Sequence, residues 1–265
     1  MSMKSVRLFA SATLLMVALP LTVQAFQPLV TDDTGTQGAG GNQVELSVNL
    51  DRVRVDGETE RVRTVPFVFT RGLSDTFDVF AGFSHSRIKP DSSSATVNGN
   101  ANPTVGAKWR FYESESTGST LAIKPELILP ISRPREDSGL GSGRLSGNLT
   151  FILSQEVPFG AVHVNVGVGK ERYRDTQTNP NATIRRASIA PVWDVSDQWK
   201  LAADLGVESS RAAGATTRSR FAELGAIYSP DKDVDLAFGV IRSSDNATPK
   251  SVTHTLTAGV TWRFM

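Results

Sequence analysis

Three observations in the sequence predict an all-β fold, a single 12-stranded antiparallel transmembrane β-barrel with short periplasmic turns and longer extracellular loops. The chain opens with an export signal, its remainder contains many short segments in which polar and apolar residues alternate, and no later apolar run is long enough for a membrane helix. Only helices and closed barrels satisfy every backbone hydrogen bond within lipid. An exported chain of alternating strands is therefore expected to close into a barrel.

The N-terminal 25 residues have the composition of a cleaved signal peptide. Lys4 and Arg7 form a basic start, residues 8–23 are mainly apolar, and the sequence VQA ends at Ala25 like a signal-peptidase site. A retained anchor helix is the alternative, but polar residues and a proline interrupt the apolar run. We expect a signal peptide at 1–25, a periplasmic N-terminal segment at 26–41 and a transmembrane barrel at 42–265. The predicted location is the bacterial outer membrane.

The composition excludes several classes of protein. Removing Lys4 and Arg7 with the signal leaves 26 basic against 27 acidic residues, a balance that gives no electrostatic reason to expect nucleic acid as a partner. The chain has 0 cysteines, which excludes disulfides, thiolate metal sites and cysteine nucleophiles. Stability must then come from backbone pairing and packing.

Twelve alternating segments, each about ten residues long as a tilted membrane strand requires, are the candidate strands. They cover residues 42–53, 61–71, 76–88, 101–112, 119–131, 144–155, 160–173, 182–195, 198–209, 218–229, 233–242 and 252–264. The connections alternate in length: GLSD, ESESTG, EVPF, SD and PDK are short, and mostly longer polar stretches lie between them. Short turns on one rim and longer loops on the other are typical of outer-membrane barrels.

Each strand has an apolar face and a polar face, and the charged side chains lie on the polar one. The last strand, TLTAGVTWRF at 255–264, shows the alternation most clearly and is expected to close against residues 44–50. A charge on the lipid face costs about 2 to 4 kcal/mol at mid-depth, so the polar face must line the lumen. The predicted lumen-lining residues are Lys108, Arg110, Lys124, Glu126, Arg186, Lys200, Asp204, Glu208 and Glu223.

Aromatic residues support this orientation because they gather beside the short turns, where a membrane interface is expected. The residues concerned are Phe69, Phe77, Phe111, Tyr112, Trp193, Trp199, Tyr228, Trp262 and Phe264.

The polar stretch 31–42 precedes the first strand on the periplasmic side. It could fold back into the lumen as a partial plug, with Asp32 and Asp33 meeting lysine or arginine side chains of the wall. A disordered tail is the equally favoured alternative.

The start of the mature chain resembles an exported family described as outer-membrane components of the MetA pathway of phenol degradation, often labelled transporters. The shared stretch is Pro-Leu-x-Thr-Asp-Asp-x-Gly-Thr, which this sequence matches at Pro28, Leu29, Thr31, Asp32, Asp33, Gly35 and Thr36. The resemblance implies a barrel and a transport role for small compounds, with aromatic compounds as candidates. Unlike the aromatic last residue usual in outer-membrane barrels, Met265 follows Phe264.

The sequence patterns that could indicate a catalytic or metal site each lack residues that such a site requires. His85 and His254 face outward near the long loops, as in a lipid-face acyl hydrolase, but neither has a serine two residues away on its strand. His163 faces the lumen without a second histidine at ligand spacing, and DKDVD at 231–235 lacks the glycine and glutamate of a calcium loop. We therefore predict no enzyme, no catalytic residue, no metal and no cofactor.

The sequence thus favours a channel or transporter for passive passage of a small solute. A non-conducting structural or binding barrel that uses its extracellular loops is the first alternative, and the acyl hydrolase is the second. The expected partners are outer-membrane lipid, a small-molecule solute, periplasmic chaperones and the barrel-assembly machinery, without nucleic acid.

Overall fold

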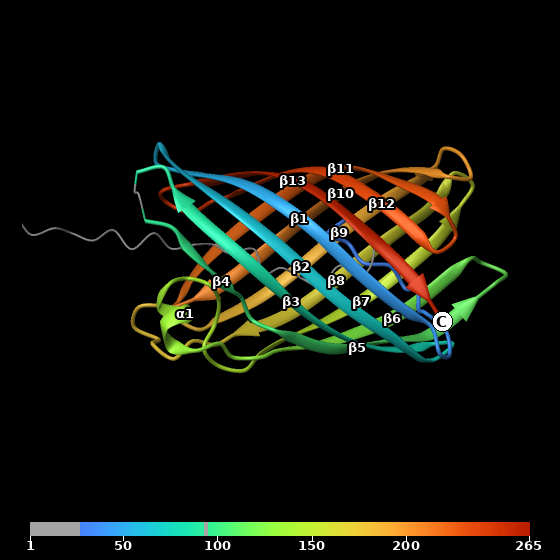
Figure 1. The fold of residues 1–265 in the computed structure, drawn as a ribbon, viewed down its shortest axis with the longest axis horizontal. Helices are drawn as coiled ribbons and strands as arrows, with labels where there is room; N and C mark the ends of the chain where they lie inside the picture. Colours follow the sequence, from blue (N-terminus) through green and yellow to red (C-terminus); the bar gives the residue numbers. More distant parts are fainter. Residues whose placement is uncertain (1–26, 93–94) are drawn as a thin grey trace, which may run out of the picture.

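The computed structural model describes residues 27–92 and 95–265 and forms a closed antiparallel β-barrel of twelve strands with one additional short strand (Figure 1). The predicted signal peptide at 1–25 lies outside the described residues. The strands are β1 (Asn42–Val55), β2 (Glu58–Ser74), β3 (Phe77–Pro90), β4 (Val97–Asn100), β5 (Thr104–Ser114), β6 (Ser119–Ile128), β7 (Ser146–Val157), β8 (Gly160–Glu171), β9 (Ala182–Asp194), β10 (Trp199–Ala212), β11 (Ala215–Asp231), β12 (Val234–Asp245) and β13 (Ser251–Phe264). Sequential strands pair except β4 and β5, which both pair with β3, and β1 pairs with β13, which closes the barrel as predicted.

The additional strand β4 changes one detail of the prediction. The sequence predicts one strand at 101–112, whereas the chain forms β4 and β5 with an irregular break at 101–103 between them. The far half of β3 pairs with β4 through His85 and Asn100, and its near half pairs with β5 through Phe77 and Trp109. Pro103 lacks a backbone N–H, which is consistent with a break in the ladder at this point.

The two rims differ in their connections. The short-turn rim carries the β2–β3, β5–β6, β7–β8, β9–β10 and β11–β12 turns together with the C-terminus, at the right of Figure 1. The long-loop rim carries the longer connections at 91–103, 129–145, 172–181 and 246–250, and the loop 129–145 contains the helix α1 (Arg133–Asp137).

Two connections at the long-loop rim are tighter than predicted. The β1–β2 and β10–β11 hairpins turn through two residues each, Asp56-Gly57 and Ala213-Gly214, all at positive φ. Such turns match the twist of the paired strands, so the strands continue through stretches that the sequence analysis assigned to loops.

The outer surface of the barrel is apolar. On β10, Leu205 and Val207 are 54% and 58% exposed, whereas Asp204, which directly precedes Leu205, is fully buried inside. The same alternation exposes large apolar side chains along the other strands. Within the described chain, no helix is long and apolar enough to cross a membrane. A soluble protein would bury these side chains, so their outward position is that of a lipid-facing wall.

Aromatic rings border the short-turn rim. Trp199 and Tyr228 on neighbouring strands have ring centroids 4.8 Å apart, and Trp262 stacks on Phe264 at 4.5 Å. Rings with a polar edge are favoured where lipid meets water.

Candidate functional site

The N-terminal segment, residues 27–41, lies inside the barrel and follows the inner wall (Figure 1). Starting from β1 at the short-turn rim and reading backwards, it contacts β2 and β3, then β5, β6 and β7, then β9 and β10, and finally β11 to β13. The segment therefore touches side chains contributed by most of the barrel wall.

The segment is anchored near β1 by close backbone packing. The Gly72 N–H donates to the Gly41 carbonyl at 2.9 Å, and the Gly40 N–H donates to the Gly72 carbonyl at 3.0 Å. A Cβ atom on Gly72 would lie only 1.8 Å from the Gly38 carbonyl oxygen, so the approach requires glycine. Beyond this point, the Gln37 N–H donates to the Asp78 carboxylate of β3 at 3.0 Å.

Asp32 forms the electrostatic centre of the lumen. Its two carboxylate oxygens accept hydrogen bonds from Lys108 Nζ of β5 at 2.9 Å and Lys124 Nζ of β6 at 2.5 Å, and all three side chains are buried. Burial acts to raise the pKa of the Asp32 carboxyl, but attraction to Lys108 and Lys124 and the hydrogen bonds from both lysines outweigh it, so the pKa lies below its ordinary value. Asp32 is therefore ionised at neutral pH and compensates two buried cations.

Hydroxyl groups extend this network on both sides of Asp32. The Thr31 N–H donates to Asp204 Oδ2 at 2.7 Å, and the Thr31 hydroxyl hydrogen-bonds to Asp204 Oδ1 and to the Ser188 hydroxyl. The Thr34 N–H donates to the Ser154 hydroxyl of β7 at 3.1 Å. Thr31 and Thr34 of the segment thus find hydrogen-bond partners on the wall, away from bulk water.

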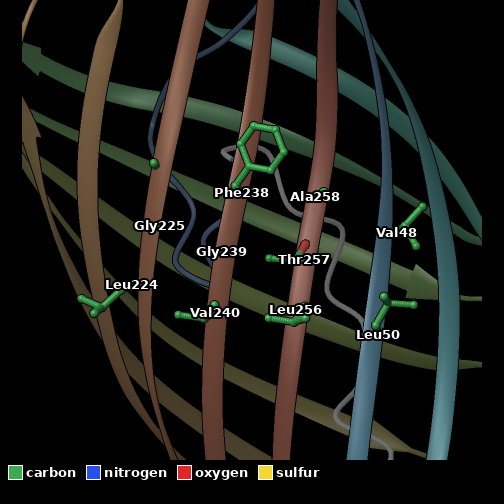
Figure 2. Close-up of a pocket in the computed structure, with 11 residues that line it drawn as sticks. Val48, Leu50, Leu224, Gly225, Phe238, Gly239, Val240, Leu256, Thr257 and Ala258 are labelled. Carbon is green, nitrogen blue, oxygen red and sulfur yellow. The ribbon is translucent and has the colours of Figure 1, made fainter.

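The first residues of the segment pack closely against apolar side chains and glycines of the barrel wall. Leu29 is fully buried against Ala190 and Val192 of β9 and Ala202 of β10. A Cβ on Gly225 would lie 2.7 Å from Pro28 Cγ, and one on Gly239 would lie 3.1 Å from Pro28 Cβ. Figure 2 shows the blue N-terminal segment passing behind these two glycines. Glycine at these wall positions leaves room for the proline ring.

The nine predicted lumen-lining residues fall into two groups. Lys108, Lys124 and Asp204 bond to the segment directly, and Glu223 lies buried opposite Asp204 on β11. The other five bond to the wall. Their partners are Asn148 for Glu126, Glu208 for Arg186, Asp194 for the half-exposed Lys200, and the Asp75 carbonyl and Glu113 for Arg110. The role of these residues in passage stays a prediction.

The predicted N-terminal motif also divides. Pro28, Thr31 and Asp32 contact the wall as described, and the Asp33 carbonyl accepts from Lys108 at 3.0 Å. The Gly35 N–H instead donates within the segment, to Asp33 Oδ1 at 2.6 Å. Gly35 therefore shapes the segment without bonding to the barrel.

Sequence reasoning missed Asp78, Ser154, Ser188 and Thr120, which also bind the segment. Thr120 bonds through its hydroxyl to the Thr34 hydroxyl. All four lie on the polar face of their strands, so the alternation that identified the lysines also places them inward. Ser154, Ser188 and Thr120 are uncharged and therefore did not stand out in the sequence. Asp78 is charged, but it lies beside a turn, where acidic residues are common.

The weaker candidate chemistries have ordinary explanations in the structure. Both ring nitrogens of His85 bond to asparagine oxygens, Asn98 and Asn100 of β4, at 2.8 Å. His163 bonds to the Ser154 hydroxyl at 2.8 Å, but the oxygen of that hydroxyl also accepts a hydrogen bond from the Thr34 N–H of the segment. Over residues 27–92 and 95–265, no group of three or more histidine, aspartate or glutamate side chains is placed to hold a metal ion.

Comparison with solved structures shows the fold. The structure is similar to an outer membrane channel from Pseudomonas putida F1, with a TM-score of 0.71 and 14% identity over 88% of this chain and 98% of that one. The β domain of a Bordetella autotransporter gives 0.54 at 14% identity, covering 85% and 100% of the two chains. The NanC porin gives 0.53 at 10% identity, covering 82% and 98%.

The family comparison extends over almost the whole sequence. No curated protein matches the chain. The family described as "Putative MetA-pathway of phenol degradation" matches residues 19–264, which include the N-terminal segment and every strand, and the chain belongs to this family.

Proposed function

We propose that the protein is a channel of the bacterial outer membrane for passive passage of a small solute, with aromatic compounds as the favoured class. The observation that carries the proposal is the sorting of side chains in a closed barrel, with apolar residues outside and ionised residues such as Lys108, Lys124 and Asp32 inside. A watery axis within a lipid-facing wall is the arrangement that channels use. The family description and the similar outer membrane channel support this role.

We further propose that the N-terminal segment is a partial plug that sets the width of the passage. A 12-stranded barrel is narrower than a 16-stranded porin, and a segment bonded to opposite sides of the wall narrows it further. The intact protein should therefore conduct weakly.

A non-conducting barrel is the second candidate, and the same segment favours it. Its bonds to β3, β5, β6, β7 and β10 could close the lumen permanently, leaving the long-loop rim as the functional surface. The acyl hydrolase has no such support, because among the described residues no serine hydroxyl bonds to His85 or His254.

Single-channel recording in planar bilayers separates these candidates. The purified mature protein is compared with a variant lacking residues 26–37, in the absence and presence of phenol and benzoate. A plugged channel predicts small current steps for the intact protein, larger steps for the deletion variant, and a reversible decrease in current when the aromatic solute enters.

The controls make the result specific. Asp32→Asn should enlarge the steps because it releases the segment, while Asp175→Asn, in an exposed loop beyond β8, should leave them unchanged. If neither the intact protein nor the deletion variant gives stepwise currents, although both are folded, the non-conducting barrel is the correct reading.

A further inference from the structure

A row of basic side chains crosses the outer surface of the barrel near the long-loop rim. Arg242 of β12 lies opposite His254 of β13, His254 lies opposite Arg52 of β1, Arg52 lies opposite Arg61 of β2, and Arg61 lies opposite Lys89 of β3. Five neighbouring strands thus place a basic residue at the same height. All five side chains are exposed on the outward face.

Acidic side chains of the protein neutralise little of the positive charge of this row. Arg61 pairs with Asp91 at 3.3 Å, and across the described part of the chain no ion pair is formed by Arg52, Arg242 or Lys89. Like charges on directly opposed residues of neighbouring strands destabilise a sheet. Anionic groups from outside the chain would relieve this repulsion.

An apolar groove of about 570 Å³ lies next to this row on the same outer surface, on its short-turn side. Figure 2 shows the residues that line the groove. In the register of the sheet, Val240, Leu256 and Leu50 lie two residues from Arg242, His254 and Arg52 on their strands, on the side toward the short-turn rim. That step is about 7 Å. The charged row and the groove therefore form one continuous surface.

Small residues make the groove. Ala226 and Ala258 lie among its lining residues, and five larger lining side chains are at least 48% exposed. These five are Leu50, Leu224, Phe238, Val240 and Leu256, and the partly buried Val48 also lines the groove. A flexible acyl chain can fill such a depression, and in a bilayer the lipid-facing wall is surrounded by acyl chains.

We propose that this surface is a binding site for a phosphate-bearing lipid of the leaflet next to the long-loop rim. Arg52 and Arg242, about 10 Å apart across β13, would hold the phosphate groups, and one acyl chain would lie in the groove below. Guanidinium groups suit phosphate because their donors match two of its oxygens at once. The proposal rests on the barrel spanning the outer membrane and is independent of whether it conducts.

The charge pattern favours lipid over a second copy of the barrel. In a two-fold symmetric contact through this surface, Arg52 and Arg242 of one copy would face the same residues of the other, and like charges across an interface oppose association. A lipid supplies both the anionic head and the apolar tail that the surface needs.

The test measures binding of lipid A, a bisphosphorylated glycolipid with several acyl chains, to the full mature protein in uncharged detergent. Three variants are compared with the unaltered protein: Arg52→Gln with Arg242→Gln, Ala226→Leu with Ala258→Leu to fill the groove, and Arg185→Gln with Arg211→Gln as a control. Arg185 and Arg211 are exposed on β9 and β10, near the same rim but away from the groove. Dephosphorylated lipid A and inorganic phosphate are tested as competitors.

We expect the affinity of the Arg52/Arg242 variant for lipid A to fall by about tenfold or more. The reason is that each basic residue near an anionic lipid surface adds to the electrostatic attraction. The filled groove should also weaken binding, and the control should change it less than about twofold. The two competitors should be ineffective because each lacks half of the ligand. Equal losses in both arginine variants, effective competition by inorganic phosphate, or dimers that the Arg52/Arg242 variant disrupts would each overturn the proposal.

Discussion

The backbone N–H of Thr31 donates a hydrogen bond of 2.7 Å to Oδ2 of Asp204, although 173 residues separate the two along the chain. The Thr31 hydroxyl bonds to the other carboxylate oxygen at the same distance. One wall carboxylate of β10 thus binds two groups of the N-terminal segment. Asp204 is fully buried, so water does not compete for it.

Replacing Asp204 with asparagine should loosen this end of the segment. The amide retains one acceptor and turns an N–H₂ group toward a donor, so one charge-assisted bond is lost, worth about 1.5 to 3 kcal/mol. The chain contains 0 cysteines, so a single cysteine in Val30→Cys can report segment opening. Its modification by a bulky thiol reagent at fixed pH should become about 10- to 150-fold faster. Asp197→Asn, in the exposed β9–β10 turn, should leave the rate unchanged, and an unchanged rate in Asp204→Asn would contradict the assignment.

Acid should release the segment through Asp32. Its pKa is lowered from 3.8 in the folded protein, because Lys108 and Lys124 outweigh the effect of burial. Stability from a carboxylate with a depressed pKa is fully present above its ordinary pKa and is lost as pH falls through the folded value. A spin label at Val30→Cys should remain immobilised from pH 7 down to 3.8 and become mobile only in stronger acid. Asp32→Asn should give a mobile label throughout, whereas release above 3.8 would show that another group controls docking.

The strand pattern could be read from the sequence because lipid imposes it locally. Successive residues of a strand point to opposite faces, so Leu205 and Asp204 were expected to face lipid and lumen respectively, and the structure places them so. The two-residue turn at Asp56-Gly57 was also readable, since Asp-Gly favours this turn, but the surrounding polar residues suggested a longer loop. The path of residues 27–41 was not readable: contacts such as Thr31 with Asp204 depend on which wall positions closure brings together, and a polar tail carries no periodicity.

Gly72 should be intolerant of any side chain. An added Cβ would lie 1.8 Å from the Gly38 carbonyl oxygen, and because this oxygen belongs to the backbone it cannot rotate away. Gly72→Ala should therefore destabilise the docked segment by about 1 to 3 kcal/mol, the usual cost of overpacking. Gly167→Ala is the matched control, since its Cβ would find its nearest neighbour at 3.4 Å. Faster thiol modification at Val30→Cys in Gly72→Ala alone is the expected result, and equal rates in the two variants would refute it.

The lipid-facing orientation predicts a depth-dependent cost for charge on one strand. Leu205 and Ser209 of β10 share the outward face, with Leu205 nearer the middle of the strand and Ser209 nearer the long-loop rim. Leu205→Arg should lower the free energy of unfolding from lipid vesicles by about 2 to 4 kcal/mol, because the guanidinium loses hydration in hydrocarbon. Ser209→Arg should cost no more than about 1 kcal/mol, because its side chain reaches the interface. Denaturant titration of both variants in vesicles measures the difference. Equal costs at the two positions would mean that this face does not meet a bilayer, and the channel and the lipid site would both lose their physical basis.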